Sequence, residues 1–276
     1  MLPSYFQFTQ SNLQDYLDCP RRFDLRYILR QEWPATQTEP ELEQEKHMLR
    51  GHLFHQMVHQ RLVGLPVEQL SGQIEDDDLR RWWESFLHHA PLDGLPSNRL
   101  PEFSLTAPFA GFRLLAKYDV LAIDPGKRAV IVDWKTSLHR PARHTLQERM
   151  QTRLYSFLLV EAGARLNGGK PISPEQVEMI YWFPEESENP ENFNYSTGQY
   201  QDDRAYLEGL IAEIQQHEKG SYLLTPNEKL CVFCVYRSLC DRGKSAGDYQ
   251  DQEEENSANS DQPLDLDFEQ IGEIEF

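Results

Sequence analysis

Two apolar segments separated by a tight turn constrain the fold of this chain more than any other feature. The segments "FRLLAKYDVLAI" (112–123) and "RAVIVDWKT" (128–136) flank the tetrapeptide "DPGK". Tight turns favour Pro and Gly, so the pattern predicts an antiparallel hairpin. Asp133 and Lys135 interrupt the second segment two residues apart, and side chains at that spacing lie on the same face of a strand. An acid and a base therefore share one face of a strand that is otherwise suited to burial.

The expected hairpin register brings another acid close to this pair. Around the turn, residues whose numbers add up to 251 or 252 lie opposite each other, so Asp119 is expected beside Asp133, with Cβ atoms about 5 Å apart. Two carboxylates at that separation repel each other, and burial increases the cost. A hard divalent cation such as Mg²⁺ removes the conflict, because it binds carboxylate oxygens.

Lys135 adds a positive charge to the same face. One alternation further along the strand, its ammonium group would point at an anion bound by the metal. Two acids and a lysine around a metal suit phosphodiester hydrolysis, since the metal activates water while metal and lysine stabilise the developing charge. A salt bridge on a solvated hairpin face is the alternative interpretation, because an isolated D-x-K pattern often occurs by chance.

Histidines in the segment "GHLFHQMVHQ" are further candidate ligands. His52, His55 and His59 have spacings that share a helix face. His55 and His59 match half of a zinc-protease motif, but Gln56 stands where that motif needs its general base. A helical histidine taken alone is more often structural or exposed than a ligand.

The remaining pattern predicts a central sheet flanked by helices, in an α/β or α+β arrangement. Pro20 is expected to split the helical segment 11–29, with Ser11 or Asn12 as its N-cap. Other elements are predicted as helices at about 41–62, 76–89, 141–162 and 202–217, a loop at 91–101, and a strand at 177–183 followed by a polar loop.

Charge is unevenly distributed along the chain. The net charge is −18, but the segment from Asp248 to Phe276 holds eleven acids and no Lys or Arg, which leaves −7 for residues 1–247. The tail is too polar and too like-charged to pack, so we expect it to be disordered. Five basic residues against Glu148 give the segment 135–153 a local charge of +4, which favours an anion nearby. The basic residues are Lys135, Arg140, Arg143, Arg149 and Arg153.

Composition places the chain among soluble proteins. No apolar run approaches the roughly 20 residues of a membrane span, and the start "MLPSYFQFTQ" lacks a signal-peptide pattern. We therefore expect a cytoplasmic protein.

Four cysteines suggest metal ligation more than disulfides in such a chain. The run "CVFCVYRSLC" has the spacing C-x2-C-x5-C, through Cys231, Cys234 and Cys240, and Cys19 would supply the fourth thiol. Cysteine thiolates at this spacing can hold a structural zinc ion or an iron–sulfur cluster. The residues themselves leave both open.

Together these segments resemble the RecB-like branch of the PD-(D/E)XK nucleases, particularly the iron–sulfur members: the CRISPR-associated RecB-like nucleases and the AddB nuclease domain. The opening "SNLQDYLDCPRRF" is similar to the S-x-L-x-x-Y-x-x-C-P start of that family, "GHLFH" to its G-x-x-x-H helix, and "QTRLY" to its Q-x-x-x-Y motif. Asp119 matches the first metal-binding acid, and Asp133 with Lys135 matches the D/E-x-K pair. Ala116 departs from the glycine that the family often has three residues before the aspartate.

The resemblance implies a restriction-endonuclease-like core with a central mixed sheet flanked by helices. It implies that His55, Asp119 and Asp133 bind Mg²⁺ or Mn²⁺, with Lys135 as a catalytic residue beside the two acids. The Trp134 carbonyl would be a further metal ligand. It also implies a [4Fe–4S] cluster on the four cysteines that joins the N- and C-terminal parts, with zinc as the alternative.

The resemblance further places Gln151 and Tyr155 near DNA, and the nearby arginines on phosphates. We expect residues 1–243 to form one nuclease domain, with a cysteine module of Cys19 plus 225–243, and residues 244–276 to form the acidic tail. The expected function is that of a metal-dependent DNA nuclease acting on single strands or ends, in DNA repair, recombination or CRISPR adaptation.

Two alternatives to that function stay open, a catalytically silent DNA-binding or assembly subunit of the same fold and a zinc-stapled interaction protein. The end of the tail, "PLDLDFEQIGEIEF", sets apolar residues among acids. Such a segment can bind a protein partner or the protein's own basic groove, whereas an uninvolved solvated tail is the alternative.

Overall fold

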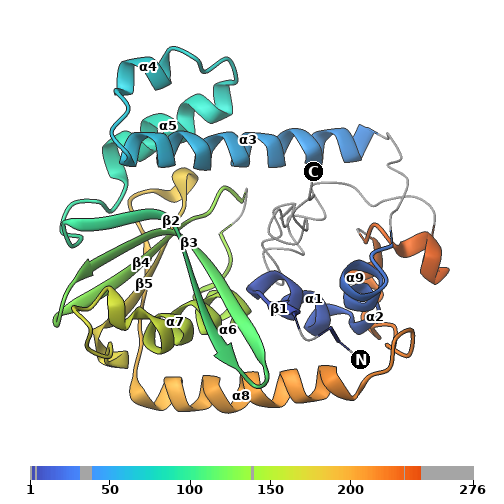
Figure 1. The fold of residues 1–276 in the computed structure, drawn as a ribbon. Coiled ribbons are helices and arrows are strands. Elements are labelled where there is room, and N and C mark those ends of the chain that lie inside the picture. Colours follow the sequence, from blue (N-terminus) through green and yellow to red (C-terminus); the bar gives the residue numbers. More distant parts are fainter. Residues whose placement is uncertain (1, 4, 32–38, 138–139, 233, 244–276) are drawn as a thin grey trace, which may run out of the picture.

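A mixed sheet of six strands forms the centre of the fold (Figure 1). The structure is a computed structural model, and it describes residues 2–3, 5–31, 39–137, 140–232 and 234–243. The strand order is β1-β3-β4-β5-β6, and β2 also pairs with β3. The β1–β3 and β4–β5 pairs are parallel, and the other pairs are antiparallel. The strands are β1 (Gln7–Phe8), β2 (Asn98–Phe109), β3 (Phe112–Asp124), β4 (Arg128–Trp134), β5 (Val177–Trp182) and β6 (Glu191–Asn194).

Helices cover both faces of this sheet (Figure 1). Helix α7 packs on one face with α8 beyond it, whereas α3 and α5 pack on the opposite face. The α-helices are α1 (Gln10–Asp18), α2 (Pro20–Phe23), α3 (Glu39–Leu62), α4 (Val67–Ser71), α5 (Asp77–His89), α6 (Arg143–Glu148), α7 (Met150–Ala162), α8 (Thr197–Gln216) and α9 (Lys229–Val232). A π-helical segment, Asp24–Ile28, follows α2.

Strand β4 contributes apolar side chains to both cores. Ala129 and Ile131 belong to the core on the α7 side, whereas Val130, Val132 and Trp134 belong to the core on the α3 side. A central strand with helices on both faces has this composition because neither face meets water. The predicted hairpin of β3 and β4 is confirmed, and its paired residues have numbers that add up to 252.

The N- and C-terminal parts of the described chain lie side by side (Figure 1). The Tyr16 hydroxyl donates to Glu213 Oε1 at 2.7 Å, and the Arg21 amide donates to the Leu223 carbonyl at 3.0 Å. These contacts bring the segment around Cys19 against the segment that follows α8. The two ends are therefore in contact through the polypeptide itself.

Several helix boundaries differ from the sequence-based expectation. Thr9, rather than Ser11 or Asn12, caps α1, and the Asn12 side chain accepts from the Thr9 amide in a reciprocal capping box. The helix expected over 141–162 is two helices, because Arg149 has an extended backbone with ψ of 142°. Helix α8 begins before the expected Asp202, where Ser196 accepts a hydrogen bond from the Gln199 amide as N-cap.

The sheet is also larger than the sequence indicated. Strand β2 begins inside the loop expected at 91–101, and β6 lies in the polar loop expected after 177–183. Among the described residues, none of the helices is long and apolar enough to cross a membrane. The acidic tail, 244–276, lies outside the described residues.

Replacing Phe54 on α3 tests the core on the α3 side of the sheet. Phe54 is fully buried, and its ring stacks on Trp182 with centroids 6.4 Å apart, whereas the neighbouring Leu53 is 38% exposed. We expect Phe54→Ala to lower the free energy of unfolding by about 3–5 kcal/mol and Leu53→Ala by about 0.5 kcal/mol or less. Urea denaturation of the two variants measures both values, and equal losses would show that α3 does not dock through Phe54.

Candidate active site

The regular alternation of side chains along β3 is broken at Asp119. The residues of β3 in the core on the α7 side change from even to odd numbers along the strand: Leu114, Ala116 and Tyr118, then Leu121 and Ile123. Asp119 lies at the change. Regular alternation has a period of two, so the strand departs from a regular twist at this residue.

The neighbouring strand β2 changes at the residue opposite. Leu100, Phe103 and Leu105 all pack against the same core, although Leu100 and Phe103 are three residues apart. Glu102 lies between them with a φ of +51°, a conformation that side chains other than glycine rarely adopt. The β2–β3 pairing continues on both sides of Glu102 and Asp119 but does not include them. Glu102 and Asp119 therefore lie at a single interruption of the β2–β3 hydrogen-bond ladder.

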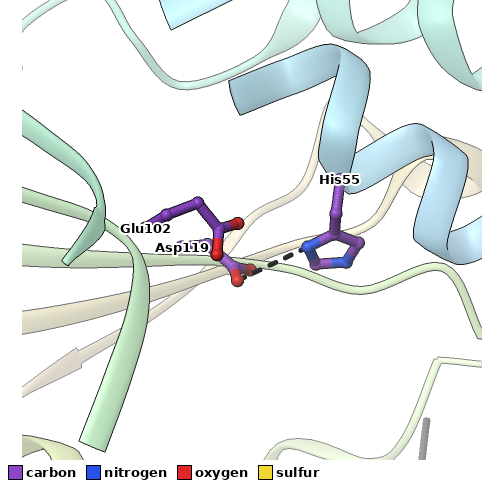
Figure 2. A group of neighbouring side chains, drawn as sticks. All are labelled: His55, Glu102 and Asp119. Carbon is purple, nitrogen blue, oxygen red and sulfur yellow. Dashed lines mark ion pairs between the residues drawn. The ribbon is translucent and has the colours of Figure 1, made fainter. Parts of the chain in front are cut away.

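These two acids face a histidine from the helix above the sheet (Figure 2). His55 on α3 places Nδ1 3.4 Å from Asp119 Oδ1. One ligand atom each from His55, Glu102 and Asp119 lies within 4.8 Å of the other two. The group combines two carboxylates with one imidazole, a donor set that suits Mg²⁺ or Mn²⁺. The structure thus contains a candidate metal site.

The opposite charges of His55 and Asp119 raise the pKa of the histidine and lower the pKa of the aspartate. Burial disfavours the charged form of both, yet Asp119 raises the pKa of His55 above its ordinary value. The pKa of Asp119 is lowered in spite of burial by His55 and by the Trp134 amide, which donates to Oδ2 at 2.8 Å. The field at this site therefore favours a positive charge.

Asp133, Lys135 and Gln151 form a closed, buried triangle. Lys135 Nζ lies 2.9 Å from Asp133 Oδ2 and donates to Gln151 Oε1 at 2.8 Å. Gln151 Nε2 donates in turn to Asp133 Oδ1 at 2.6 Å. All three residues are less than a tenth exposed. The amide of Gln151 uses its donor and its acceptor together, so it fixes the acid and the base of the D-x-K pair relative to each other.

Two tyrosines line the triangle. Tyr155 is buried, and its pKa is raised by burial and by Asp133 and Asp119, while a hydrogen bond with Gln151 opposes the shift. The ring of Tyr181 lies 5.5 Å from Lys135 Nζ, in cation–π geometry. Gln151 and Tyr155 therefore lie beside the D-x-K pair, and their contact with substrate stays a prediction.

Gly51 explains how α3 reaches the end of β4. A Cβ atom at Gly51 would lie 2.8 Å from Thr136 Oγ1, so glycine allows the helix to approach the residue that follows Lys135. One turn further along α3, His55 lies on the same helix face and meets Asp119. In "GHLFH", Gly51 thus allows α3 to approach the end of β4, and His55 contacts Asp119.

Most of the arginines expected near an anion are engaged by acids. Arg153 Nη1 lies 2.9 Å from Asp203 Oδ1. Arg140 and Arg143 both pair with Glu191 of β6. The local excess of positive charge counted along the sequence is therefore largely neutralised in space, and phosphate contacts by these arginines stay a prediction.

The structure distributes the predicted metal ligands over two groups. His55 and Asp119 lie together, whereas Asp133 belongs to the triangle with Lys135. The β3–β4 pairing ends at Val120 and Val132, and beyond it the Trp134 amide bonds to the Asp119 carboxylate. Asp119 and Asp133 therefore belong to one strand end without being a paired residue couple.

Sequence reasoning missed Glu102. Tyr118 and Leu121 on β3, like Leu100 and Phe103 on β2, pack on the same core although they are three residues apart. This irregularity is visible only in the structure, because Val120 is also apolar and the sequence therefore shows no gap on β3.

The four cysteines do not show the predicted cluster. None of them forms a disulfide, and Cys19 and Cys231 are buried. The pKa of Cys240 is raised to about 11 by burial and by the other three thiols, Cys234 foremost, so these thiols lie within electrostatic range of it. Among the described residues, however, no three cysteine sulfur atoms lie within 4.8 Å of one another. A cysteine-ligated metal centre stays a prediction.

Comparison with known proteins shows the family of this chain. A family model of the PD-(D/E)XK nuclease superfamily matches residues 7–241, so the chain belongs to that superfamily. The fold agrees with a solved structure from Eubacterium rectale, of a protein named provisionally as an exonuclease. That match has a TM-score of 0.55 and 12% identity and covers 90% of this chain and 92% of that one.

A second solved structure, of the protein SSO0001, matches with a TM-score of 0.42 and 12% identity over 87% of this chain and 88% of that one. No match was found among curated proteins.

A methyl group at Gly51 tests the placement of His55. Gly51→Ala should destabilise the protein because Thr136 is stiff and its hydroxyl must move. Gly209→Ala on α8, where a Cβ meets nothing within 4 Å, should instead stabilise by up to about 1 kcal/mol. Thermal denaturation of both variants measures the difference. Adding Thr136→Ala to Gly51→Ala should recover the loss, and a cycle without such coupling would contradict the assigned contact.

Proposed function

We propose that the protein is a metal-dependent deoxyribonuclease of the RecB-like branch that acts on single-stranded DNA or DNA ends. The observation that carries the proposal is the convergence, at one end of the sheet, of His55 and Asp119 with the Asp133–Lys135–Gln151 triangle. Membership of the PD-(D/E)XK superfamily supports the nuclease activity. The similarity to the RecB-like motifs supports the choice of branch and substrate.

The donor set fits a divalent cation. His55, Asp119 and Asp133 would hold Mg²⁺ or Mn²⁺, with carboxylate oxygens and one imidazole nitrogen as ligands. Such an ion supplies an activated water and stabilises charge on the phosphate. Asp119 raises the pKa of His55, so a metal at this site would compete with a proton for the imidazole. Metal uptake should therefore release a proton.

Lys135 is the residue proposed to act on the phosphate or the attacking water. Its Nζ is held by Asp133 and Gln151 at 2.9 and 2.8 Å, so its direction is fixed before substrate binds. A preorganised cation stabilises a developing negative charge without reorganisation cost. Gln151 would act as a positioning residue in this scheme, and Tyr155 would border the substrate.

The arginine pairs suggest how DNA would be admitted. Arg153 is bound to Asp203, and Arg140 and Arg143 are bound to Glu191. DNA phosphates would have to compete with these acids, so binding should weaken steeply as salt increases. Stacking of unpaired bases on aromatic side chains would add affinity for single strands.

Substitutions of Asp133 and Lys135 distinguish a catalytic role of this buried ion pair from a role in stability. Removing one partner leaves a buried charge uncompensated and costs about 3–5 kcal/mol. We therefore expect Asp133→Asn and Lys135→Met each to destabilise the protein, and Asp133→Asn with Lys135→Met together to be more stable than either. All three should lose cleavage of end-labelled linear and circular single-stranded DNA in Mn²⁺ by about a hundredfold or more.

The exposed pair Asp124–Lys127, 3.0 Å apart on the hairpin turn, is the matched control for this test. The same two substitutions there should change stability by about 0.5 kcal/mol or less and leave cleavage intact. A folded double variant at the active site that still cleaves at the wild-type rate would refute the catalytic assignment. A wild type that binds DNA without cleaving it would favour the silent DNA-binding subunit.

The cysteines are proposed to hold a [4Fe–4S] cluster, with zinc as the alternative. Four thiols are the donor type that both centres take. Burial and the neighbouring thiols raise the pKa of Cys240, and a bound cationic centre would oppose that shift. A single zinc ion requires sulfur atoms about 3.8 Å apart in a tetrahedron of 2.3 Å bonds. Among the described residues no three of the thiols lie within 4.8 Å of one another, so the choice of an iron–sulfur cluster rests on the resemblance to the iron–sulfur nucleases.

Substitution of the distant thiol tests this assignment. Cys19→Ser and Cys234→Ser should both lose the bound metal and part of the stability, because removal of any ligand opens the same site. Metal analysis and the ultraviolet–visible spectrum of the purified protein distinguish coloured iron from colourless zinc. Ser238→Ala, between Cys234 and Cys240, serves as control. A Cys19→Ser protein with unchanged metal content would exclude Cys19 as a ligand.

A further inference from the structure

Glu102 is the acid at the site that the family resemblance does not use. It is held on β2 opposite Asp119, and one of its oxygens lies within 4.8 Å of ligand atoms of both Asp119 and His55 (Figure 2). These three residues come from different elements, β2, β3 and α3. Their convergence is therefore a property of the fold and not of one local sequence.

The local backbone is strained at Glu102. A φ of +51° is adopted at little cost by glycine or asparagine, whereas a long side chain with a Cβ disfavours it. The side chain also lies beside the negative charge of Asp119. Both effects oppose folding, so Glu102 is placed where a smaller neutral residue would give a more stable protein.

Glu102 forms an ion pair with Lys117 on the neighbouring strand. Lys117 Nζ lies 2.8 Å from Glu102 Oε2, and the lysine side chain is 58% exposed. An ion pair at this exposure contributes little to stability, so it does not account for the strain. A flexible ammonium group on an exposed stem can leave the carboxylate when a stronger cation arrives.

We propose that Glu102 is a ligand of the divalent cation, together with His55 and Asp119, and that Lys117 neutralises Glu102 while the metal is absent. This inference rests on the proposed metal-dependent function and adds a ligand to it. Glu102 supplies the hard oxygen on the side of Asp119 away from the triangle. Asp119 would then link the Glu102 side of the site to the Asp133–Lys135 side.

Mn²⁺ binding to the purified full-length protein, followed by calorimetry and by loss of the free-ion electron paramagnetic resonance signal, tests the proposal without DNA. Glu102→Gln should weaken Mn²⁺ binding by about tenfold or more, because loss of even an outer-shell partner of a metal ligand costs that much. Lys117→Met should strengthen it, because the competing ammonium group is gone. Glu178→Gln removes an acid that is comparably buried and paired with Arg128 at 2.8 Å, and as the matched control it should bind Mn²⁺ as the wild type does.

Glu102→Gly keeps the test decisive if the glutamine variant folds poorly. Glycine relieves the strain at positive φ, so this variant should melt at the wild-type temperature or higher while its Mn²⁺ affinity falls. A lower melting temperature with Mn²⁺ affinity within twofold of wild type would make Glu102 structural and overturn the proposal, as would unchanged binding by Glu102→Gln.

The nuclease function and the assignment of Glu102 as a ligand can be refuted independently. Glu102-dependent Mn²⁺ binding in a wild type that cleaves no DNA would refute the nuclease function and support the ligand assignment. If the wild type cleaves DNA but its Mn²⁺ binding does not depend on Glu102, only the ligand assignment is refuted.

Discussion

Burial of the Asp133–Lys135 ion pair is the constraint on which the rest of the site depends. Both residues are less than a tenth exposed, so solvent screens little of either charge. The pair is tolerable only because each charge compensates the other and Gln151 bonds to both. Helix α7 must therefore lie close against the end of β4, and the break at Arg149 before α7 allows it to start there.

The opposite face of β4 fixes the same strand end. Trp134, between the acid and the base, packs edge-on against Phe86 and Trp182. Its amide then donates to Asp119, which ties β4 to β3 where their ladder has ended. The packing of Trp134 in this aromatic cluster thus positions Asp133 and Lys135, its neighbours along the chain. Rigid support of this kind is what a catalytic constellation needs.

Asp119 joins the two halves of the site. On one side it faces His55 and Glu102, and on the other it accepts from the backbone between Asp133 and Lys135. Glu102 and Asp119 lie opposite each other where the β2–β3 pairing is interrupted, and residues opposite each other on paired strands point to the same face of the sheet. The interruption is costly to the sheet, and we interpret that cost as the consequence of collecting charge for a cation.

Local chemistry could be predicted from the sequence, and irregular or distant geometry could not. The hairpin, its register and the shared face of Asp133 and Lys135 follow from turn residues and period-two alternation. Glu102 escaped prediction because β2 begins in a segment that reads as a loop, and a positive φ at glutamate has no sequence signal of its own. The charge count near Arg153 misled because its partner, Asp203, is fifty residues away.

The polypeptide contacts that bring Cys19 toward the C-terminal segment show the same limit. The hydrogen bond from Tyr16 to Glu213 spans 197 residues, and no periodicity predicts such a pair. Only the thiol spacing indicated that the two ends should meet.

Anomalous diffraction from Mn²⁺-soaked crystals tests the metal site directly, because it locates the ion without relying on activity. We expect one strong peak in contact with Asp119 and His55, at carboxylate and imidazole bonding distances of about 2.0–2.3 Å. A fully occupied Mn²⁺ ion bound elsewhere, with Asp119 and His55 still paired to each other, would contradict this assignment.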